Sequence, residues 1–268
     1  MIKYIKLNIT AGDNMLNEII KIVEQAGKIY KSAGNDLCVS EKSSSVDFVT
    51  KYDRMIQDFL IEKLTGLIPD ANFLGEEGND NKKMTDGWCF IIDPIDGTTN
   101  FVKGYQHSAI SVGLAKDREL YIGVVMDPDL NNIYYAQKGK GAYLNGKRIH
   151  VSDCNLNRSL VLFGTCPYEH ELAHRTFELT EQVFYKAIEV RRGGSAALDI
   201  CYVAAGKADL YYELILRPWD WAGATLILKE AGGIAATIDG EELDAGKITS
   251  YACGNQTNLK ELYEIYKF

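Results

Sequence analysis

The chain has 268 residues, with 29 lysines and arginines against 37 aspartates and glutamates, which gives a formal net charge of −8. An acidic chain repels nucleic-acid phosphates and anionic lipids, so we expect neither nucleic acid nor a membrane as a partner. Hydrophobic residues make up 46% and charged residues 25% of the sequence, which indicates a folded globular protein rather than a disordered or collagenous chain.

Secretion and membrane insertion are not indicated either. Lysines interrupt the apolar residues at the N-terminus, so a signal-peptide core is missing, and the longest apolar run, near residues 221–228, is too short to cross a bilayer. The six cysteines contain no Cys-x-x-Cys pair. We therefore expect a cytoplasmic protein whose thiols are reduced and mostly fill the core.

Two amphipathic helices are predicted near the N-terminus. Apolar residues recur every three or four positions over residues 16–29, after a predicted N-cap at Asp13 and before a predicted stop at Gly34. A second helix is predicted over residues 53–66. We expect both helices to pack on one face of a sheet.

The region that follows is predicted to form a β-sheet. Between residues 88 and 151, β-branched and aromatic runs alternate with turn clusters, which predicts an antiparallel meander. The pair Asn145-Gly146 is a hairpin signal that closes it.

Strands and helices alternate again after residue 155. The predicted strands lie near 160–163, 186–190 and 210–212, and the predicted helices near 169–184, 196–205, 221–231 and 257–266. No linker, repeat or low-complexity tract interrupts the chain, so one domain over residues 1–268 is expected, with subdomains of about 13–151 and 152–268. The pattern predicts an α/β chain of large sheets layered with helices.

Several segments resemble catalytic or ligand-binding motifs but are better explained as parts of the structure. His170-Glu-Leu-Ala-His174 matches the H-E-x-x-H zinc pattern, but Pro167 places it in a surface helix start and no later histidine supplies a third ligand. Residues 141–147 nearly complete a P-loop, but Arg148 stands where Ser or Thr is required. Residues 193–197 resemble a nucleophile elbow, but no histidine follows them. His107 and His150 are interpreted as structural imidazoles.

The most unusual segment is Asp93-Pro-Ile-Asp96-Gly97-Thr98-Thr-Asn. A buried apolar strand runs into two aspartates, and then into residues suited to a helix start. This geometry directs two carboxylates and free backbone N–H groups at one point, which suits cations and a phosphate together. An isolated segment of this kind is also an ordinary polar turn.

Two further acidic segments favour a cation and phosphate site over an ordinary polar turn. Glu76 and Glu77 end the short apolar strand predicted over residues 72–75, and Asp220 opens an apolar helix. Either alone is a cap or a solvated corner. An all-oxygen set without His or Cys selects a hard cation such as Mg²⁺ or Mn²⁺, and converging carboxylates repel one another without cations.

Taken together, these segments make the chain similar to the inositol monophosphatase family, within the superfamily of fructose-1,6-bisphosphatases and lithium-sensitive phosphatases. The matching segments are 42–53, 75–77, 93–101, 139–146, 194–197 and 219–233, and the resemblance extends from about residue 19 to 254. It implies the αβαβα five-layer sugar-phosphatase fold, with a mostly antiparallel N-terminal sheet and a second C-terminal sheet. It also implies a homodimer and inhibition by lithium. Residues 168–180 match no motif of the family.

The resemblance implies a set of metal ligands. Glu76, Asp93 and the Ile95 carbonyl hold one magnesium ion, and Asp93, Asp96 and Asp220 hold a second. A third, weaker ion lies near Glu76, and Mn²⁺ substitutes for Mg²⁺.

It also implies catalytic and substrate-binding residues. Thr98, hydrogen-bonded to Asp53, polarises the attacking water together with Glu76, and the backbone N–H groups of Gly97 and Thr98 hold the phosphate. The alcohol half of the substrate meets a set of polar and small residues: Asp96, Gly194, Ser195, Ala196, Glu213 and Asp220. Arg191 and Arg192 either approach an anionic substrate or a partner subunit, or form a solvated pair.

The expected function is Mg²⁺-dependent hydrolysis of a small polyol or sugar phosphate monoester, with inositol 1-phosphate as the leading substrate. Alternatives with the same chemistry are fructose 1,6-bisphosphate, a 3′-phosphonucleotide such as 3′-phosphoadenosine 5′-phosphate, and histidinol phosphate. A catalytically silent regulatory binding protein is disfavoured, because every expected ligand is present in the sequence.

Overall fold

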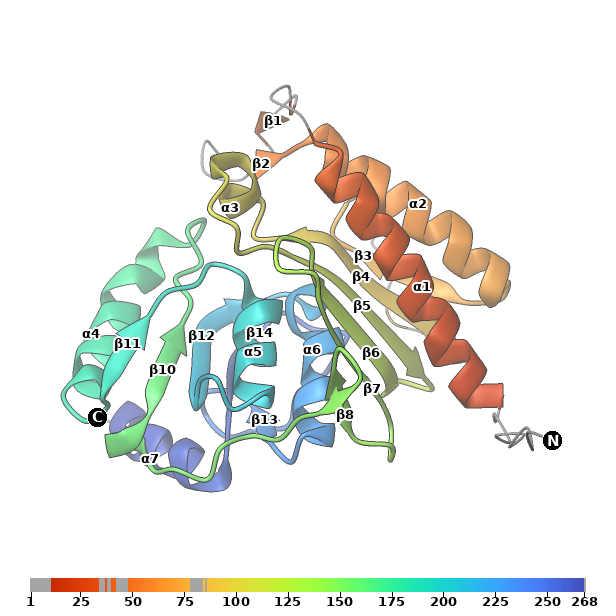
Figure 1. The fold of residues 1–268 in the computed structure, drawn as a ribbon. Coiled ribbons are helices and arrows are strands. Elements are labelled where there is room, and N and C mark those ends of the chain that lie inside the picture. The colour runs from red at the N-terminus through yellow and green to blue at the C-terminus, as the bar shows by residue number, and fades with distance from the viewer. Residues whose placement is uncertain are drawn as a thin grey trace.

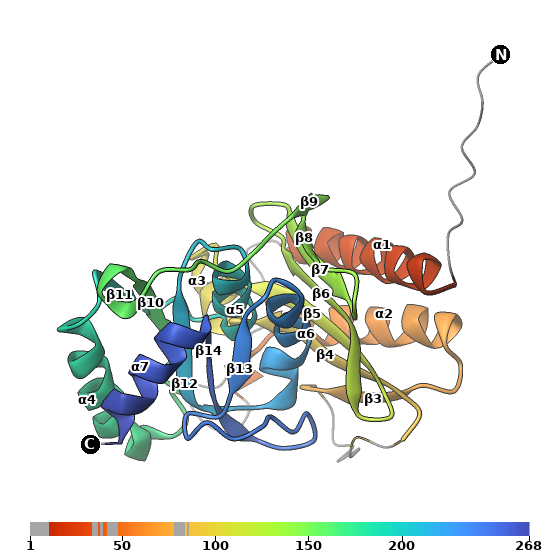
Figure 2. The same ribbon diagram turned by 90° about the horizontal axis from the view of Figure 1, so that it is seen from below.

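The computed structural model of the chain describes residues 11–33, 37, 40–41, 48–77, 84 and 86–267. Its elements form five layers in the order helix, sheet, helix, sheet, helix (Figure 1 and Figure 2). The expected αβαβα arrangement is therefore confirmed. A small additional sheet pairs β1 (Ser40–Glu41) with β2 (Phe48–Val49).

The first layer consists of α1 (Ala11–Lys31) and α2 (Lys51–Leu67). Both helices pack on one face of the larger sheet, as predicted, and their buried side chains join those of the sheet in one hydrophobic cluster. The predicted N-cap of α1 is wrong, because the helix begins at Ala11. The apolar periodicity that predicts this helix starts at Leu16 and does not mark the turn before it. The predicted stop at Gly34 lies outside the described residues.

A capping box starts α2. Thr50 is the N-cap, and its Oγ1 accepts a hydrogen bond from the Asp53 N–H at 3.4 Å. The Asp53 carboxylate accepts in return from the Thr50 N–H at 2.7 Å. These reciprocal bonds satisfy two N–H groups that a helix start leaves open, so they fix Asp53 in a completely buried position.

The larger sheet has the order β3-β4-β5-β6-β7-β8-β9. Its strands are β3 (Asn72–Gly75), β4 (Trp88–Asp96), β5 (Ala109–Lys116), β6 (Glu119–Asp127), β7 (Asn132–Gln137), β8 (Ala142–Leu144) and β9 (Lys147–Arg148). β3 pairs parallel with β4, and all later neighbours pair antiparallel, which confirms the meander. Asn145 and Gly146 join β8 to β9 with φ angles of 48° and 80°, as a two-residue hairpin requires.

The second sheet has the order β11-β10-β12-β14-β13. Its strands are β10 (Leu160–Phe163), β11 (Glu189–Arg191), β12 (Leu210–Leu216), β13 (Ile234–Ala236) and β14 (Thr249–Gly254). β10 pairs parallel with β11 and β12, whereas β14 pairs antiparallel with β12 and β13. The strand predicted over 186–190 begins later, because the N–H groups of Lys186 and Ala187 still bond to the Val183 carbonyl at the preceding helix end.

The remaining helices occupy the middle and the outer layer. α5 (Ala196–Ala204) and α6 (Pro218–Glu230) lie between the two sheets, and α4 (Ala173–Phe184) and α7 (Gln256–Tyr266) cover the far side of the second sheet (Figure 1). A 3₁₀ turn, η1 (Leu156–Arg158), precedes β10, and another, η2 (His170–Leu172), precedes α4. His170 and His174 are both exposed, in agreement with a solvated helix start.

Glycines allow α6 to approach the larger sheet closely. A Cβ atom built on Gly123 of β6 would lie 2.2 Å from the Gly223 carbonyl oxygen of α6. A Cβ atom on Gly113 of β5 would lie 3.1 Å from the Gly223 nitrogen. Side chains at these positions would force the helix away from the sheet, and with it the α6 N-terminus that carries Asp220.

The described cysteines form no disulfide, as the sequence analysis expected. Cys89, Cys154, Cys166, Cys201 and Cys253 are free, and Cys38 lies outside the described residues. Among the described helices, none combines the length with the apolar character that a membrane crossing requires.

Candidate functional site

One pocket collects most of the predicted site. Its lining comes from β4, the start of α3 (Thr98–Lys103), the turn before α5, β12 and the start of α6. Glu76, Asp93, Ile95, Asp96, Gly97, Thr98, Gly194, Ser195, Ala196, Glu213 and Asp220 all line it. Of the predicted site residues, Asp53 alone is absent from this lining, since it is buried behind Thr98.

The end of β4 turns the chain into this pocket. The pairing of β4 with β5 shifts register between Asp93 and Asp96, so the strand is irregular where the two aspartates leave it. Asp93 is 2% exposed, and its Oδ1 accepts from the Ile95 N–H at 3.0 Å. Gly97 follows with φ 87°, a conformation that other residues rarely adopt, and caps α3 without a side chain. The cap residue therefore offers no side chain to the N–H groups of this helix start, which lie at the pocket.

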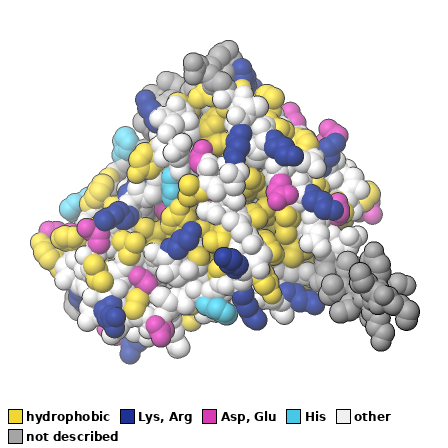
Figure 3. All heavy atoms as spheres, viewed as in Figure 1, with side chains coloured by type: hydrophobic (Ala, Val, Ile, Leu, Met, Phe, Trp, Pro, Cys, Tyr) yellow, Lys and Arg dark blue, Asp and Glu magenta, His cyan; other side chains and the backbone are white. Residues whose placement is uncertain are grey.

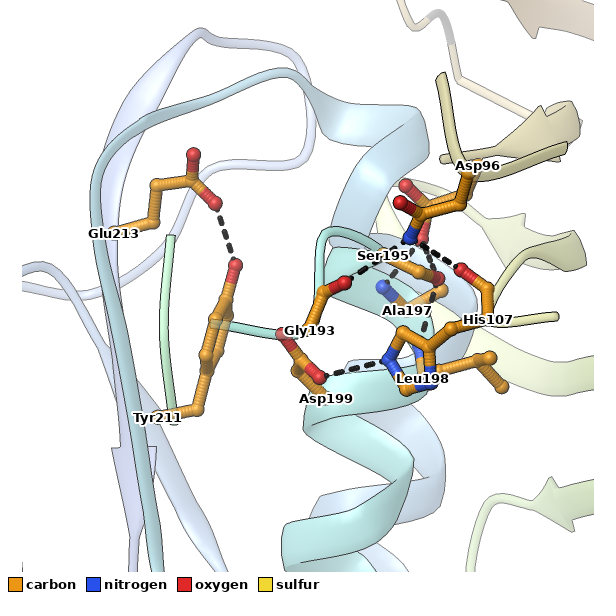
Figure 4. Close-up of polar contacts among 10 residues, drawn as sticks. Asp96, His107, Gly193, Ser195, Ala197, Leu198, Asp199, Tyr211 and Glu213 are labelled. Carbon is orange, nitrogen blue, oxygen red and sulfur yellow. Dashed lines mark hydrogen bonds and ion pairs between the residues drawn. The ribbon is translucent and has the colours of Figure 1, made fainter. Parts of the chain in front are cut away.

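Asp96 joins the two halves of the molecule. Its Oδ2 accepts from the Ser195 hydroxyl at 2.6 Å and from the Ala197 N–H at 2.7 Å, and Ser195 is itself the N-cap of α5 (Figure 4). Burial raises the pKa of Asp96 to about 7 although these two hydrogen bonds lower it. The charges of Asp199 and Glu76 raise it further.

Thr98 faces a buried carboxylate. Its hydroxyl lies 3.2 Å from Asp53 Oδ1 and 3.1 Å from the Ile95 carbonyl oxygen, and it donates to either acceptor. Asp53 Oδ2 is engaged by the Thr50 N–H and hydroxyl, at 2.7 and 2.6 Å. The contact between Thr98 and Asp53 that the sequence suggested is therefore present, while its catalytic role stays a prediction.

Glu76 stands at the end of β3, where a side chain of α2 braces the backbone. The Glu76 N–H donates to the Ile92 carbonyl at 3.3 Å, and the Glu77 N–H donates to Gln57 Oε1 at 3.0 Å. Gln57 Nε2 donates in turn to the Glu77 carbonyl. The backbone on both sides of Glu76 is thus held by α2 and β4.

Asp220 approaches from the α6 N-terminus. Its Oδ2 accepts from the Arg217 N–H at 2.7 Å, which closes the first turn of the helix. Burial raises the pKa of Asp220 well above its usual value, and the charges of Asp96, Glu76 and Glu213 add to this effect. The acidic side chains of the pocket therefore repel one another, and a cation among them would relieve that repulsion.

The donor chemistry fits a hard cation. Asp93, Asp96, Asp220 and Glu76 offer carboxylate oxygens around one pocket. Among the described residues, however, no three His, Cys, Asp or Glu side chains come together closely enough to form a metal site by themselves. The assignment of individual ligands accordingly stays a prediction.

Glu213 holds the opposite wall. Its Oε1 accepts from the Cys166 N–H at 2.8 Å and its Oε2 from the Tyr211 hydroxyl at 2.6 Å (Figure 4). A Cβ atom on Gly164 would lie 1.8 Å from Glu213 Oε2. Glu213 therefore anchors the loop after β10, a role that the sequence analysis missed because the loop and β12 are distant in sequence.

Two further residues of the pocket, Tyr168 and Arg217, were not predicted from the sequence as site residues. The Arg217 guanidinium lies 5.9 Å from the centre of the Tyr168 ring. Both residues of the arginine pair are exposed, but only Arg192 lines the pocket, whereas Arg191 pairs with Glu189 at 3.1 Å.

A partly buried pair also lies beside the pocket, and Asp199, one of its members, is part of the pocket lining. His107 Nε2 is 3.1 Å from Asp199 Oδ1, beside the turn that carries Gly194 and Ser195. The interpretation of His107 as a satisfied structural imidazole agrees with this contact, but the aspartate partner, 92 positions away in sequence, was not foreseen.

Comparisons with known proteins agree with this architecture. Residues 12–267 match the model of the inositol monophosphatase family. The inositol-1-monophosphatase of Rhizobium meliloti is 36% identical over 261 residues, which cover 95% of this chain and 97% of that protein. The Nus factor SuhB of Vibrio cholerae is 36% identical over 243 residues, 88% of this chain and 90% of that protein.

Solved structures give the same result. The inositol monophosphate-bound form of SaIMPase-II, an enzyme of Staphylococcus aureus, has a TM-score of 0.81 and 30% identity, and covers 94% of this chain and 93% of that one. Members of the matched family hydrolyse phosphate monoesters and are generally metal-dependent. The chain belongs to the inositol monophosphatase family.

Proposed function

We propose that this chain is a Mg²⁺-dependent phosphatase of small polyol or sugar phosphates, and that inositol 1-phosphate is its main substrate. The observation that carries the proposal is that four carboxylates and the α3 start, which has no side-chain cap, line one pocket. Carboxylates suit hard cations, and free N–H groups suit a phosphate. Two cation sites would be held by Glu76, Asp93 and the Ile95 carbonyl, and by Asp93, Asp96 and Asp220, with a third, weaker one near Glu76.

The residues at the pocket would each have a separate role in phosphate hydrolysis. When bound, Mg²⁺ would supply Lewis acidity toward the phosphate oxygens and lower the pKa of a bound water. The Gly97 and Thr98 N–H groups would orient the phosphate. The Thr98 hydroxyl donates its hydrogen bond to Asp53 or to the Ile95 carbonyl, so its oxygen is left to accept a hydrogen bond from the attacking water. Glu76 would accept one proton of that water as the water oxygen bonds to phosphorus. The ester P–O bond then breaks, and the departing alkoxide oxygen takes up a proton from solvent.

The alcohol half of the substrate would lie against the second half of the chain. Asp96 and Asp220 offer carboxylate oxygens to polyol hydroxyl donors, and the Gly194-Ser195-Ala196 turn forms the floor. Glu213 is held by two hydrogen bonds and keeps further acceptor capacity on each oxygen.

Fructose 1,6-bisphosphate is the second candidate. Arg192 and Arg217 line the same pocket and offer cationic groups to a second phosphate. A nucleotide is a further possibility by analogy, because SaIMPase-II has also been solved with 2′-AMP.

Phosphate release from a substrate panel tests the proposal. The panel contains inositol 1-phosphate, fructose 1,6-bisphosphate, 2′-AMP, 3′-phosphoadenosine 5′-phosphate and histidinol phosphate, each with Mg²⁺, with EDTA, and with Mg²⁺ plus lithium. We expect the highest kcat/KM for inositol 1-phosphate, no turnover in EDTA and inhibition by lithium. Asp93→Asn should abolish turnover, whereas Asp58→Asn, an exposed substitution on α2, should not. Turnover that persists in EDTA or in Asp93→Asn would refute the proposed site.

We further propose that the enzyme is a cytoplasmic homodimer. Large apolar side chains are exposed on α4 and just after it, at Phe177, Phe184, Tyr185 and Ile188. Hydrophobic side chains also appear at the left edge of Figure 3, where Figure 1 places α4. Light scattering of the purified chain tests this proposal, and Phe177→Ser with Tyr185→Ser should yield monomers if these residues form the contact.

A further inference from the structure

A partly buried histidine–aspartate pair lies beside the substrate side of the pocket, and its aspartate, Asp199, is part of the pocket lining. His107 follows α3 and leads into β5, and Asp199 lies in the first turn of α5. The distance from His107 Nε2 to Asp199 Oδ1 is 3.1 Å, and the two side chains are 15% and 2% exposed. The Tyr202 ring packs edge-on against the imidazole at 5.6 Å. The pair therefore links the segment after α3 to α5, the helix whose N-cap is Ser195 (Figure 4).

The pair is in close contact with the glycine turn between these elements. A Cβ atom on Gly193 would lie 2.2 Å from Asp199 Oδ1 and 2.6 Å from His107 Nε2. Residue 193 must therefore be glycine while the pair is in place. Its carbonyl accepts from Asn100 Nδ2 at 3.0 Å, and the same amide donates to the His107 carbonyl at 2.7 Å. The turn is thus held by the ion pair on one side and by α3 on the other.

Any movement of this turn would displace residues that line the pocket. Ser195 directly follows the two glycines, and its hydroxyl donates to Asp96 at 2.6 Å. The Gly194 carbonyl oxygen is 2.9 Å from the place that a Cβ atom of Gly97 would occupy, so the turn also touches the start of α3. The positions of Asp96 and Ser195 consequently depend on the position of the turn.

The charges around the imidazole favour its protonated form. Burial lowers the pKa of His107, but the hydrogen bond and charge of Asp199, with the charges of Asp96 and Asp127, outweigh it and raise the pKa overall. Burial raises the pKa of Asp199, while the hydrogen bond and charge of His107 and the charge of Arg192, the residue before the glycine turn, lower it. An imidazolium ion paired with a buried carboxylate holds its geometry more firmly than a neutral contact does.

We propose that His107 and Asp199 are a positioning pair that fixes the Gly193–Ser195 turn against α3 and thereby sets the alcohol side of the substrate pocket. The kinetic part of this inference rests on the proposed phosphatase function. The structural part does not, because it concerns the turn alone. A pair that merely stabilises the start of α5 would leave substrate binding unchanged in the folded enzyme.

Kinetics of the full chain test the role. We compare wild type with His107→Gln, with Asp199→Asn, with both together, and with the control His150→Gln, which alters an exposed histidine. Each of the first two changes should raise KM for the best substrate of the panel about tenfold, with kcat lowered less than about threefold. The double variant should cost no more than one single change, because the residues act as a unit. Unchanged KM values, or costs that add, would overturn the inference.

The pH dependence separates positioning from simple folding stability. KM of the wild type should rise as the imidazolium loses its proton at alkaline pH, whereas KM of His107→Gln should stay flat over the same range. The groups that face the imidazole are Asp199, Asp96, Asp127 and the Tyr202 ring. Asp199→Asn retains the shape of the side chain, so it tests the pair even if His107→Gln fails to fold.

Hydrogen exchange gives a readout without activity. Backbone amides in peptides that span residues 192–198 should exchange about tenfold faster in His107→Gln and in Asp199→Asn than in wild type, and at the wild-type rate in His150→Gln. Equal exchange in all four proteins would overturn the inference. If wild type releases no phosphate from any substrate, the proposed function fails, and exchange alone decides whether the pair holds the turn.

Discussion

The Thr98 hydroxyl lies 3.2 Å from the carboxylate of Asp53, a residue 45 positions earlier in the chain. Asp53 cannot turn away, because Thr50 engages its other oxygen twice within the capping box of α2. A helix cap that stabilises the first layer of the fold therefore also orients a hydroxyl in the pocket. Asp53 therefore has two roles, one in the start of α2 and one in the orientation of Thr98.

Thr98→Val should lower kcat about 100-fold or more, the size of effect expected when a group that handles the proton of the attacking water is removed. The substitution keeps the shape of the side chain and removes only the hydroxyl. Thr98→Ser keeps the hydroxyl and should retain most of the activity. Steady-state phosphate release with Mg²⁺ measures both variants, and equal rates in Thr98→Val and wild type would remove Thr98 from the reaction.

Asp220→Asn should stabilise the metal-free protein at alkaline pH. The pKa of Asp220 is raised in the folded state, so the carboxyl contributes stability that is fully present below its unfolded pKa of about 4 and is lost as the pH rises through the folded value. The amide has no charge to bury, and its oxygen still accepts from the Arg217 N–H. In EDTA near pH 8 the variant should melt about 3 °C or more above wild type, and the difference should shrink near pH 5.

Added Mg²⁺ should reverse this order. A cation bound to the folded state raises the melting temperature, and wild type should gain more than Asp220→Asn because it keeps the charged ligand. Asp58→Asn, an exposed substitution on α2, is the matched control and should melt like wild type in every buffer. If wild type in EDTA near pH 8 is the more stable protein, Asp220 is not under electrostatic strain.

Gly123→Ala should destabilise the fold by about 1–3 kcal/mol, because its methyl group would collide with the Gly223 carbonyl of α6, 2.2 Å away. Gly66→Ala provides the opposite case. Gly66 lies in the exposed last turn of α2 with nothing within 4 Å of a new Cβ atom, so alanine should stabilise the helix by about 0.5–1 kcal/mol. Urea denaturation measures both, and similar midpoints for the two variants would contradict this account of helix packing.

Local chemistry explains which parts of the fold were predictable. The hairpin at Asn145-Gly146 follows from two residues that tolerate positive φ. The capping box of α2 also lies within four consecutive residues, but it was not predicted, and the helix begins at Lys51 rather than at residue 53. β13 and β14 were missed for the opposite reason. β14 is a strand because it pairs with β12 and β13, and β13 has only three residues. Short segments of this kind are fixed by their neighbours in the sheet rather than by their own pattern.

The same distinction between local and distant residues applies to the pocket. Asp93, Asp96 and Gly97 lie within five positions, so the sequence reveals their proximity. The bonds from Ser195 to Asp96 and from Asp199 to His107 cross more than ninety positions and carry no local signal. Only the two glycines at 193 and 194 hint at a crowded turn, and nothing in the sequence states what crowds it.

The stability that His107 contributes should depend on pH. Its folded pKa is raised, so the contribution is fully present below the unfolded pKa of about 6.5 and is lost as the pH rises through the folded value. His107→Gln should therefore lose more stability relative to wild type near pH 6 than near pH 9, because the imidazolium of the wild type is lost as the pH rises through its folded pKa. Urea denaturation at the two pH values measures the difference, with the exposed His150→Gln expected to show none. A larger loss near pH 9 would mean that the imidazole is neutral beside Asp199 and that the pair holds the glycine turn by a hydrogen bond alone.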